Sequence, residues 1–365
     1  MNAGPVVIMA GGTGGHVFPG LAVAEALKRR DGAVVWLGTR RGMEARLVPQ
    51  HGIDIEWISI SGLRGKGALA WVAAPFRIAL AVAQVLAMLN RRRPSAVLGM
   101  GGFVAGPGGL AAWLARRPLL IHEQNAIAGT TNRWLARLAA RVFEAFPGSF
   151  PPGVRAEHVG NPVRASIEAL PPPRERFAHR SGQRPRLLVL GGSQGARALN
   201  RLLPEALALL PPERRPEVRH QAGSRNFDDT RGRYAELHGA DERMQVTAFI
   251  DDMAEAYGWA DLVVARAGAL TVSELAAAGV GAVLIPFPHA IDDHQTKNAE
   301  AFTGRGAGVI IAERDLTPER LARELDALLH DRAKLLELAE RARAQAKPGA
   351  AERIAAACME AGGAR

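Results

Sequence analysis

Short runs of apolar residues, many of them β-branched, alternate along this chain with longer stretches rich in alanine and leucine. Apolar runs of four or five residues are typical of strands buried on both faces of a parallel sheet, and the longer stretches are typical of the helices that cover it. We predict strands at residues 6–10, 33–37, 96–100, 119–122, 187–190, 262–265 and 282–286. The alternation predicts an α/β fold with doubly wound parallel sheets.

The chain is long enough, at 365 residues, to form two domains. Residues 146–173 are rich in proline and only weakly periodic, so we place the boundary there, near residue 163. The two halves open alike, with VVIMAGGTGGH at residues 6–16 and LLVLGGSQGAR at residues 187–197. This similarity predicts two Rossmann-like domains, 1–163 and 164–345, followed by a segment 346–365; the alternative is two unrelated glycine turns after strands.

The amino-acid composition narrows the class of protein and the compartment in which it is expected. Hydrophobic residues make up 48% of the chain and charged residues 22%, which excludes a disordered chain. The single cysteine, Cys358, cannot form an internal disulfide, so we expect a reducing compartment. The first residues carry no basic leader before a short apolar run, and we interpret that run as a strand rather than a signal peptide.

The net charge of +10 lies entirely in the first half of the chain. Residues 57–122 contain no acidic residue at all. The cations of this acid-free segment are Arg64, Lys66, Arg77, Arg91, Arg92, Arg93, Arg116 and Arg117. One face of the first domain is therefore expected to attract an anionic partner, which is nucleic acid, phospholipid or a phosphorylated substrate.

Three glycine-rich segments follow predicted strands, at residues 11–16, 99–109 and 191–195. A glycine loop that opens a helix presents backbone N–H groups and a partial positive charge to an anion. None of the three fits G-x-G-x-x-G, and no carboxylate follows the second predicted strand to bind an NAD ribose. A P-loop motif is absent as well, so the dehydrogenase and P-loop interpretations lose weight.

A second group of polar residues lies in the segment 261–286, which has the pattern of a strand, a glycine turn, a helix and a strand. The free N–H groups of that helix start suit a pyrophosphate, and Glu274 one turn along suits the two hydroxyls of a ribose. The alternative is that Glu274 only complements the helix dipole. An unusually polar loop follows the next strand, where α/β folds commonly bind ligands.

Nine segments in chain order, from residue 10 to about residue 300, carry a resemblance to a known family. They are GGTGGHVFPGLAVAEAL, ISGLRGKG, LGMGGFVAGPGGLAAW, HEQNAIAGTTNRWLA, VGNPVR, GGSQGARALN, FIDDM, RAGALTVSELAAAG and DDHQTKNA. Together they closely resemble the MurG family, the UDP-N-acetylglucosamine transferases that convert lipid I to lipid II in peptidoglycan synthesis.

The resemblance implies a GT-B glycosyltransferase, in which two Rossmann-like domains face a cleft and a C-terminal helix crosses back to the first domain. Residues 352–359, after Pro348, are the candidate for that helix. It implies an inverting hexosyltransferase with UDP-N-acetylglucosamine as donor and lipid I as acceptor. The implied location is the cytoplasmic face of the inner membrane, as a peripheral protein, with other cell-wall synthesis proteins as candidate partners.

The resemblance also assigns the donor contacts. In the second domain, Ile250 meets the uracil through its backbone, Glu274 the ribose hydroxyls and Gln295 the sugar hydroxyls. The pyrophosphate contacts are Ser193, Ala269, Leu270, Thr271, Val272 and Ser273. The remaining donor positions are Arg164 of GNPVR and, from the first domain, Thr13, Gly14, Gly15 and Asn125.

Forming a β-linkage from an α-linked sugar nucleotide requires one inverting displacement, with a base for the acceptor hydroxyl and stabilisation of the departing pyrophosphate. No Asp-x-Asp pattern is present, so we expect neither a metal ion nor a cofactor, and assign leaving-group stabilisation to helix N-termini and Arg164. We favour His16 as the base, with Glu123 as its rival. The alternative roles for His16 are structural, or donation to a phosphate oxygen.

Residues 67–90 carry a single charge and raise the question of a membrane-spanning helix. Pro75 and Arg77 near the middle argue against spanning, as does the need to keep one sheet on one side of the membrane. A buried helix is one interpretation. The other is an exposed patch of Trp71, Phe76 and neighbouring aliphatics, ringed by Arg64, Lys66, Arg77, Arg91, Arg92 and Arg93, that rests on an anionic membrane surface.

Two further classes of function are compatible with parts of the sequence. A UDP-N-acetylglucosamine 2-epimerase shares this general fold and donor, but it has no need for a basic, acid-free face. A nucleic-acid-binding protein explains the charge. However, only Trp71, Phe76 and Phe103 are interleaved with the cations, a poor stacking platform, so we expect no nucleic-acid partner.

Overall fold

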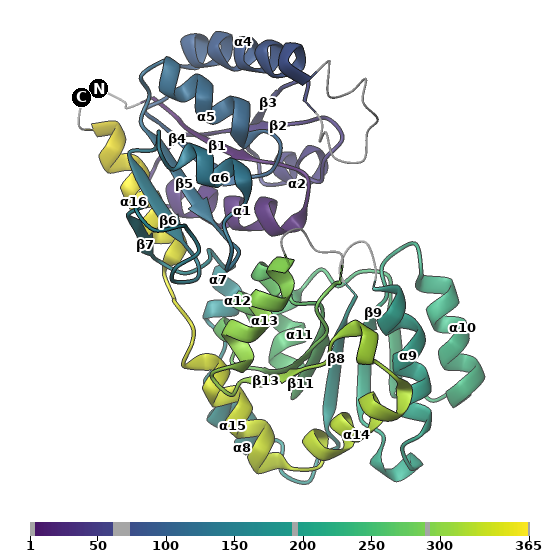
Figure 1. Cartoon of the computed structure of the whole chain (residues 1–365). Coiled ribbons are helices and arrows are strands. Elements are labelled where there is room, and N and C mark those ends of the chain that lie inside the picture. The colour runs from purple at the N-terminus through teal and green to yellow at the C-terminus, as the bar shows by residue number, and fades with distance from the viewer. Residues whose placement is uncertain (1–3, 61–73, 192–195, 289–292, 364–365) are drawn as a thin grey trace. The chain divides into compact units, whose positions relative to one another are not determined.

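The computed structural model describes residues 4–60, 74–191, 196–288 and 293–363. The chain divides into two compact units (Figure 1). Unit 1 comprises residues 1–164 together with 347–365, and unit 2 comprises residues 165–346. The last segment of the chain therefore belongs to the same compact unit as the first.

The described part of unit 1 holds a seven-stranded sheet in the order β3-β2-β1-β4-β5-β6-β7, and every pairing in it is parallel. The strands are β1 (Val6–Ala10), β2 (Val34–Gly38), β3 (Asp54–Trp57), β4 (Ala96–Gly101), β5 (Leu119–Glu123), β6 (Arg141–Glu144) and β7 (Ala156–His158). All residues of β1, β4 and β5 are buried, as continuous apolar runs in a covered parallel sheet require.

Helices cover both faces of this sheet (Figure 1). The hydrophobic core of one face takes in α1 (Gly14–Lys28), α2 (Glu44–Gln50) and α16 (Ala350–Gly363). The core of the other face takes in α4 (Ala74–Arg92), α5 (Ala105–Leu114) and α6 (Thr130–Leu135).

The C-terminal helix α16 extends beyond the predicted residues 352–359 at both ends. It packs against α1, and its residues Ile354 and Cys358 are fully buried in the core of that face. The Arg353 guanidinium also donates a hydrogen bond of 2.5 Å to the backbone oxygen of Val159. Burial raises the pKa of the Cys358 thiol to about 12, so this cysteine acts as a small apolar core residue.

The described part of unit 2 holds a six-stranded parallel sheet in the order β10-β9-β8-β11-β12-β13. Its strands are β8 (Arg186–Leu190), β9 (Glu217–Gln221), β10 (Met244–Thr247), β11 (Leu262–Ala265), β12 (Gly281–Leu284) and β13 (Gly308–Ile310). Its helices are α7 (Ala165–Glu168), α8 (Pro173–Ala178), α9 (Arg197–Ala208), α10 (Phe227–His238), α11 (Met253–Trp259), α12 (Ala269–Ala278), α13 (His294–Thr303), α14 (Pro318–Leu329) and α15 (Arg332–Arg343). Both units therefore have the strand order of a Rossmann fold, which confirms the predicted fold class.

A buried polar network ties the start of α9 to the sheet of unit 2. The His220 ring on β9 lies 3.0 Å from the Asn200 side-chain oxygen and 3.1 Å from the Tyr234 hydroxyl. Asn200 in turn donates to the backbone oxygen of Ala222 at 2.8 Å. Burial lowers the pKa of His220 to about 3, so the ring is neutral and its two nitrogens act as one donor and one acceptor.

Two positions of strand reversal follow from these orders, between β1 and β4 in unit 1 and between β8 and β11 in unit 2. In α/β sheets, ligands bind outside the carboxyl ends of the strands at such switch points. The loops that leave β1, β4 and β11 all carry glycines of the predicted binding segments. The fold therefore points to these loops as the place to look for chemistry.

Candidate functional site

The first glycine loop joins β1 to α1 and is held from within the protein. Gly12 has a φ of +95°, and its backbone N–H donates to Glu44 Oε2 at 3.0 Å. This N–H is therefore occupied by the chain's own carboxylate rather than exposed to an external anion. Thr13 follows as the exposed N-cap of α1, and Gly14 and Gly15 form the first turn.

The His16 imidazole is fixed by Gln124, which directly follows β5. His16 Nδ1 lies 3.1 Å from Gln124 Oε1, and Gln124 Nε2 donates to the Met100 backbone oxygen at 2.7 Å. Because the second bond turns the amide oxygen toward His16, the network assigns the ring hydrogen to Nδ1. The other ring nitrogen, Nε2, is then the one with a lone pair, as a general base requires.

A second histidine supports Gln124 from the core. His122 is fully buried, and its Nε2 donates to the Gly160 backbone oxygen at 2.9 Å. Its Nδ1 lies 3.2 Å from Gln124 Nε2 and accepts from it. Burial lowers the pKa of His122 to about 4, so the ring stays neutral near pH 7 and keeps this donor and acceptor pattern.

Glu123, the rival candidate for the base, is buried and fully engaged. Its Oε1 accepts from the backbone N–H and the side-chain amide of Asn125, at 3.0 and 3.1 Å. Its Oε2 accepts from the Gly129 N–H at 3.1 Å and the Asn132 amide at 2.9 Å. Protonating this carboxylate would weaken bonds to four donors, so the geometry favours His16 of the two.

The remaining donor-contact candidates of unit 1 lie close to these elements. The Asn125 backbone oxygen accepts from the Ser149 hydroxyl at 2.8 Å, which holds the loop after β5 in one conformation. The Arg164 guanidinium stacks over the Phe18 ring of α1, with its carbon 5.3 Å from the ring centroid. Arg164 is thus held beside the helix that carries Gly14, Gly15 and His16.

In unit 2 the predicted helix start is α12, which follows β11 at the switch point. Gly268 is its N-cap in an extended conformation and offers no side-chain cap. The first six residues of the helix are the predicted donor contacts from Ala269 to Glu274. Glu274 is only 5% exposed, and its Oε2 accepts from the Tyr257 hydroxyl of α11 at 3.1 Å. This contact fixes the carboxylate at one orientation.

The loop after β12 is braced by Arg266, which directly follows β11. Its guanidinium donates to the backbone oxygens of Ile285 and Pro286, at 3.2 and 3.3 Å, and forms an ion pair with Glu313. The same loop binds Gln295, whose Oε1 accepts from the Phe287 N–H at 2.9 Å. The amide of Gln295 is thereby attached to the loop beside the end of β12.

Ile250 and Ser193 are the last two predicted donor contacts. Ile250 is half-buried in the loop between β10 and α11, close in sequence to Asp252, which caps α11 by accepting from the Glu255 N–H at 2.9 Å. Ser193 lies outside the described residues, as do Arg64, Lys66 and Trp71 of the predicted membrane patch.

Among the described residues, the cations predicted to surround that patch do not all lie near it. Phe76 is 79% exposed at the start of α4, with Arg77 next to it. Arg91 and Arg92 lie at the opposite end of the same helix, about 22 Å away at 1.5 Å per residue. They form ion pairs with Glu56 of β3, at 2.7 and 2.8 Å.

These ion pairs change the charge that α4 presents. Burial acts to raise the pKa of Glu56, but hydrogen bonds from Arg92 and Arg91 hold it below its ordinary value. Arg92 also approaches Asp54 at 3.5 Å. Arg93, exposed and with a φ of +47°, directly follows the last residue of the helix. The sequence expectation failed here because both acids lie just before the acid-free segment begins.

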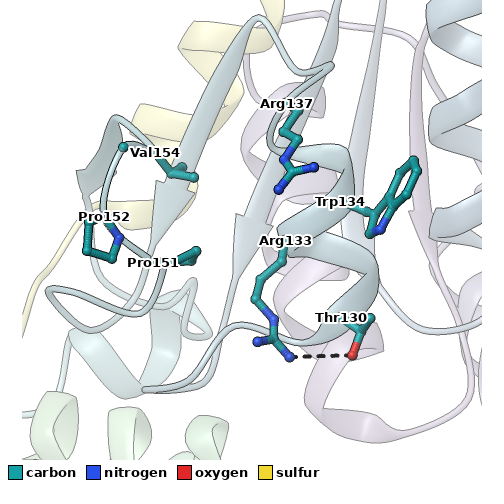
Figure 2. A pocket seen from close by; sticks show the side chains of 8 residues that line it. Thr130, Arg133, Trp134, Arg137, Pro151, Pro152 and Val154 are labelled. Atoms are coloured by element: carbon teal, nitrogen blue, oxygen red, sulfur yellow. Dashed lines mark hydrogen bonds between the residues drawn. The ribbon is translucent and has the colours of Figure 1, made fainter.

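A separate pocket of about 590 Å³ lies on unit 1, between α6 and the segment that precedes β7 (Figure 2). Its lining residues are Thr130, Arg133, Trp134, Arg137, Pro151, Pro152, Gly153 and Val154. It contains two arginines and no acidic residue, and none of the predicted donor or base residues lines it. It is therefore not the candidate site.

None of the helices that the structure describes combines the length and the apolar character that crossing a membrane requires. In the same parts of the chain, no three His, Cys, Asp or Glu side chains gather where they could hold a metal ion.

Sequence reasoning missed four residues of the candidate site: Gln124, Glu44, Tyr257 and Arg266. Arg266 directly follows a predicted strand and Gln124 lies two residues beyond another, in the segments RAGAL and HEQN of the family resemblance, so their positions were a usable signal. Glu44 and Tyr257 carry no such signal, because their partners are 32 and 17 residues away in the sequence.

Comparisons with known proteins agree over nearly the whole chain. Residues 6–144 match the glycosyltransferase family 28 N-terminal domain, and residues 186–354 match the glycosyltransferase family 28 C-terminal domain. The UDP-N-acetylglucosamine--N-acetylmuramyl-(pentapeptide) pyrophosphoryl-undecaprenol N-acetylglucosamine transferase of Nitrosococcus oceani is 58% identical over 97% of this chain and 98% of its own. The enzyme of the same name from Halorhodospira halophila is 56% identical over 99% of both chains.

A solved structure gives the same result. The crystal structure of Acinetobacter baumannii MurG matches with a TM-score of 0.83 and 42% identity, over 98% of this chain and 99% of that one. The sequence identity of each relative is far higher than a shared fold alone produces. The chain therefore belongs to glycosyltransferase family 28 and, within it, to the MurG family.

Proposed function

We propose that this glycosyltransferase moves N-acetylglucosamine from UDP-N-acetylglucosamine to the muramoyl 4-hydroxyl of lipid I, giving lipid II for peptidoglycan synthesis. The observation that carries the proposal is the full-length identity of 58% with a relative whose name states both donor and acceptor. The aligned region spans 97% of the chain, so the similarity is not confined to one of the two units.

The donor binds unit 2 in this proposal. The Glu274 carboxylate accepts the two ribose hydroxyls, and its bond to Tyr257 holds it in position before the donor arrives. The N–H groups of the first turn of α12, together with Ser193, bind the pyrophosphate. Gln295 presents its amide nitrogen to a sugar hydroxyl, because its oxygen is bound to the Phe287 N–H. Ile250 meets the uracil through its backbone.

The reaction is a single displacement with inversion at the sugar carbon. His16 Nε2 takes the proton of the acceptor hydroxyl, the oxygen forms a bond to the anomeric carbon, and the bond to the UDP oxygen breaks. Gln124 keeps the ring in the tautomer that has its lone pair on Nε2. Thr13, Gly14, Gly15 and Asn125 contribute donor contacts from unit 1.

The departing pyrophosphate is stabilised by protein groups rather than by a metal ion. Helix N-termini carry partial positive charge, and Arg164 adds a guanidinium that stacking on Phe18 holds in place. We propose no cofactor. The acceptor lies in a membrane, so the protein acts as a peripheral protein at the cytoplasmic face, and unit 1 makes the contact.

The membrane contact is the start of α4, where residues 75–80 are all exposed. Phe76 and Leu80 are 79% and 54% exposed, and Arg77 lies between them in sequence. Apolar side chains beside a cation suit an anionic leaflet. Arg64, Lys66 and Trp71, which precede α4 in the sequence, are also proposed to take part in membrane binding. Arg91 and Arg92 serve chiefly to bind Glu56, and Arg93 follows them at the far end of α4.

The purified protein should release UDP from UDP-N-acetylglucosamine only when a lipid I analogue is present, and EDTA should leave the rate unchanged. Product analysis should give a β-linked disaccharide. Release of an epimer without the acceptor would instead indicate an epimerase, and loss of activity with EDTA would contradict the metal-free mechanism.

Replacing Glu274 by Ala should weaken binding of UDP by roughly 30- to 150-fold, because two charge-assisted hydrogen bonds worth about 2–3 kcal/mol are lost. Isothermal titration with UDP measures this. Tyr257→Phe is the matched control, since it keeps the carboxylate and should change the affinity far less. Unchanged UDP affinity in folded Glu274→Ala would exclude the ribose assignment.

Replacing His16 by Ala should lower kcat by roughly 10²- to 10⁴-fold with little change in UDP affinity, as expected for the loss of a general base. Gln124→Leu should also lower kcat, but by a smaller factor. The base remains in this variant, and only the contact that selects its tautomer is lost. If His16→Ala instead weakens UDP binding and spares kcat, the ring is a phosphate ligand. A folded Glu123→Gln variant as inactive as His16→Ala would leave the base unassigned.

The double variant Phe76→Ser, Leu80→Ser should bind anionic vesicles more weakly and lose activity on a vesicle-embedded acceptor, yet keep its activity on a short-chain soluble acceptor. Leu209→Ser, which changes a residue 54% exposed on unit 2, is the control and should have no effect. Co-sedimentation with vesicles at rising salt measures the binding. Equal losses on both acceptors would contradict a membrane role for this surface.

A further inference from the structure

Glu44 is a buried carboxylate to which the proposed mechanism gives no part. It is the first residue of α2 and has no exposed surface. Its Oε1 accepts from the Thr39 N–H at 3.0 Å and the Thr39 hydroxyl at 2.8 Å, and its Oε2 accepts from the Gly12 N–H at 3.0 Å. A buried carboxylate is costly unless such donors satisfy it, so this contact is a built feature.

Three glycines make room for this carboxylate. A Cβ at Gly11 would lie 2.8 Å from Glu44 Oε1, and one at Gly38 would lie 2.8 Å from Glu44 Cγ. A Cβ at Gly42 would overlap the carboxylate itself. Gly11 lies in the connection from β1 to α1, whereas Gly38 ends β2 and Gly42 lies in the connection from β2 to α2, so two connections meet around one side chain.

The same contact leads directly to the proposed base. Gly12 precedes Thr13, the N-cap of α1, and His16 lies in the first turn of that helix. The turn after β4 also lies against this loop, because a Cβ at Gly102 would collide with the Gly11 backbone. The His16 ring lies against Gly101, where a Cβ would be 2.8 Å from ring atoms Nδ1 and Cε1. A shift of Gly11 and Gly12 would therefore move the surface on which the ring rests.

We infer that Glu44 is a positioning residue for the transfer reaction: it fills the first glycine loop as an internal anion and thereby fixes the approach of His16 to Gln124. This inference rests on the proposed function and deepens it. An error of about 1 Å in the position of a catalytic group is enough to lower a rate by roughly 100-fold. Glu44 acts through the loop and touches neither donor nor acceptor.

The first test is Glu44→Gln, which keeps the shape and removes one acceptor oxygen. The variant should lose roughly 10- to 100-fold in kcat, while KM for UDP-N-acetylglucosamine and the affinity for UDP change less than about threefold. Val85→Ala is the matched control, because it weakens the core of unit 1 beneath α4 without touching the loop. At an equal loss of thermal stability, Val85→Ala should keep its kcat.

The second test is chemical rescue. Glu44→Ala leaves the Gly12 and Thr39 donors around an empty space of carboxylate size. Formate should then raise the kcat of this variant in a saturable way, whereas chloride at equal ionic strength should not. The wild-type enzyme and His16→Ala should show no such response, since neither has the vacant position together with an intact base.

A kcat loss in Glu44→Gln no larger than in Val85→Ala, or a Glu44→Ala variant that formate fails to restore, would overturn the inference. If the Glu44 variants do not fold, the inference is tested with Thr39→Val, which removes one hydrogen-bond donor and leaves the carboxylate in place. A loss of kcat at constant KM supports the inference. Full activity of this variant contradicts it. Inactivity of the wild-type enzyme on lipid I would instead refute the proposed function, so the two failures are distinguishable.

Discussion

Every strand in both sheets runs parallel to its neighbours, and this constraint decides where the chemistry of the protein is concentrated. Parallel strands release all their following loops at one edge, and the reversal of strand order leaves a gap there between two of them. In unit 1 that edge carries the loops after β1, β4 and β5, and in unit 2 it carries the loop after β11. Residues as distant in sequence as His16 and Gln124 meet for this reason.

Near that edge, several polar side chains of unit 1 are buried. Those of the candidate site are engaged in hydrogen bonds with other groups of the protein. The Glu44 carboxylate accepts hydrogen bonds from the backbone of Gly12 and Thr39. The Glu123 carboxylate accepts them from the loop that runs from Asn125 to Gly129. The neutral ring of His122 accepts a hydrogen bond from the side-chain amide of Gln124. Buried networks of this kind are costly when incomplete, so each partner restrains the next. His16 joins this network through Nδ1, and we propose that its Nε2 is the atom that takes the proton of the acceptor.

Much of the fold followed from hydrophobic pattern alone. The strands predicted at residues 6–10 and 262–265 have those bounds in the structure, because both are continuous apolar runs in the middle of a covered sheet. Strands such as β9, with Glu217, Arg219 and His220, escaped prediction because charged and polar residues interrupt the run. Contacts between side chains were harder to predict. The ion pairs of Arg91 and Arg92 with Glu56 join a helix to a strand, and neither hydrophobic periodicity nor the count of charges indicates them.

The contact with Gln124 presets the His16 ring with its hydrogen on Nδ1 and its lone pair on Nε2. This assignment can be measured by nitrogen-15 NMR of the histidine-labelled full-length protein, with the His16 signals assigned by their loss in His16→Ala. We expect a protonated Nδ1 and an unprotonated Nε2 near neutral pH, and a change in that pattern when Gln124 is replaced by Leu. A ring protonated on Nε2 alone, or one that titrates identically with and without Gln124, would contradict it.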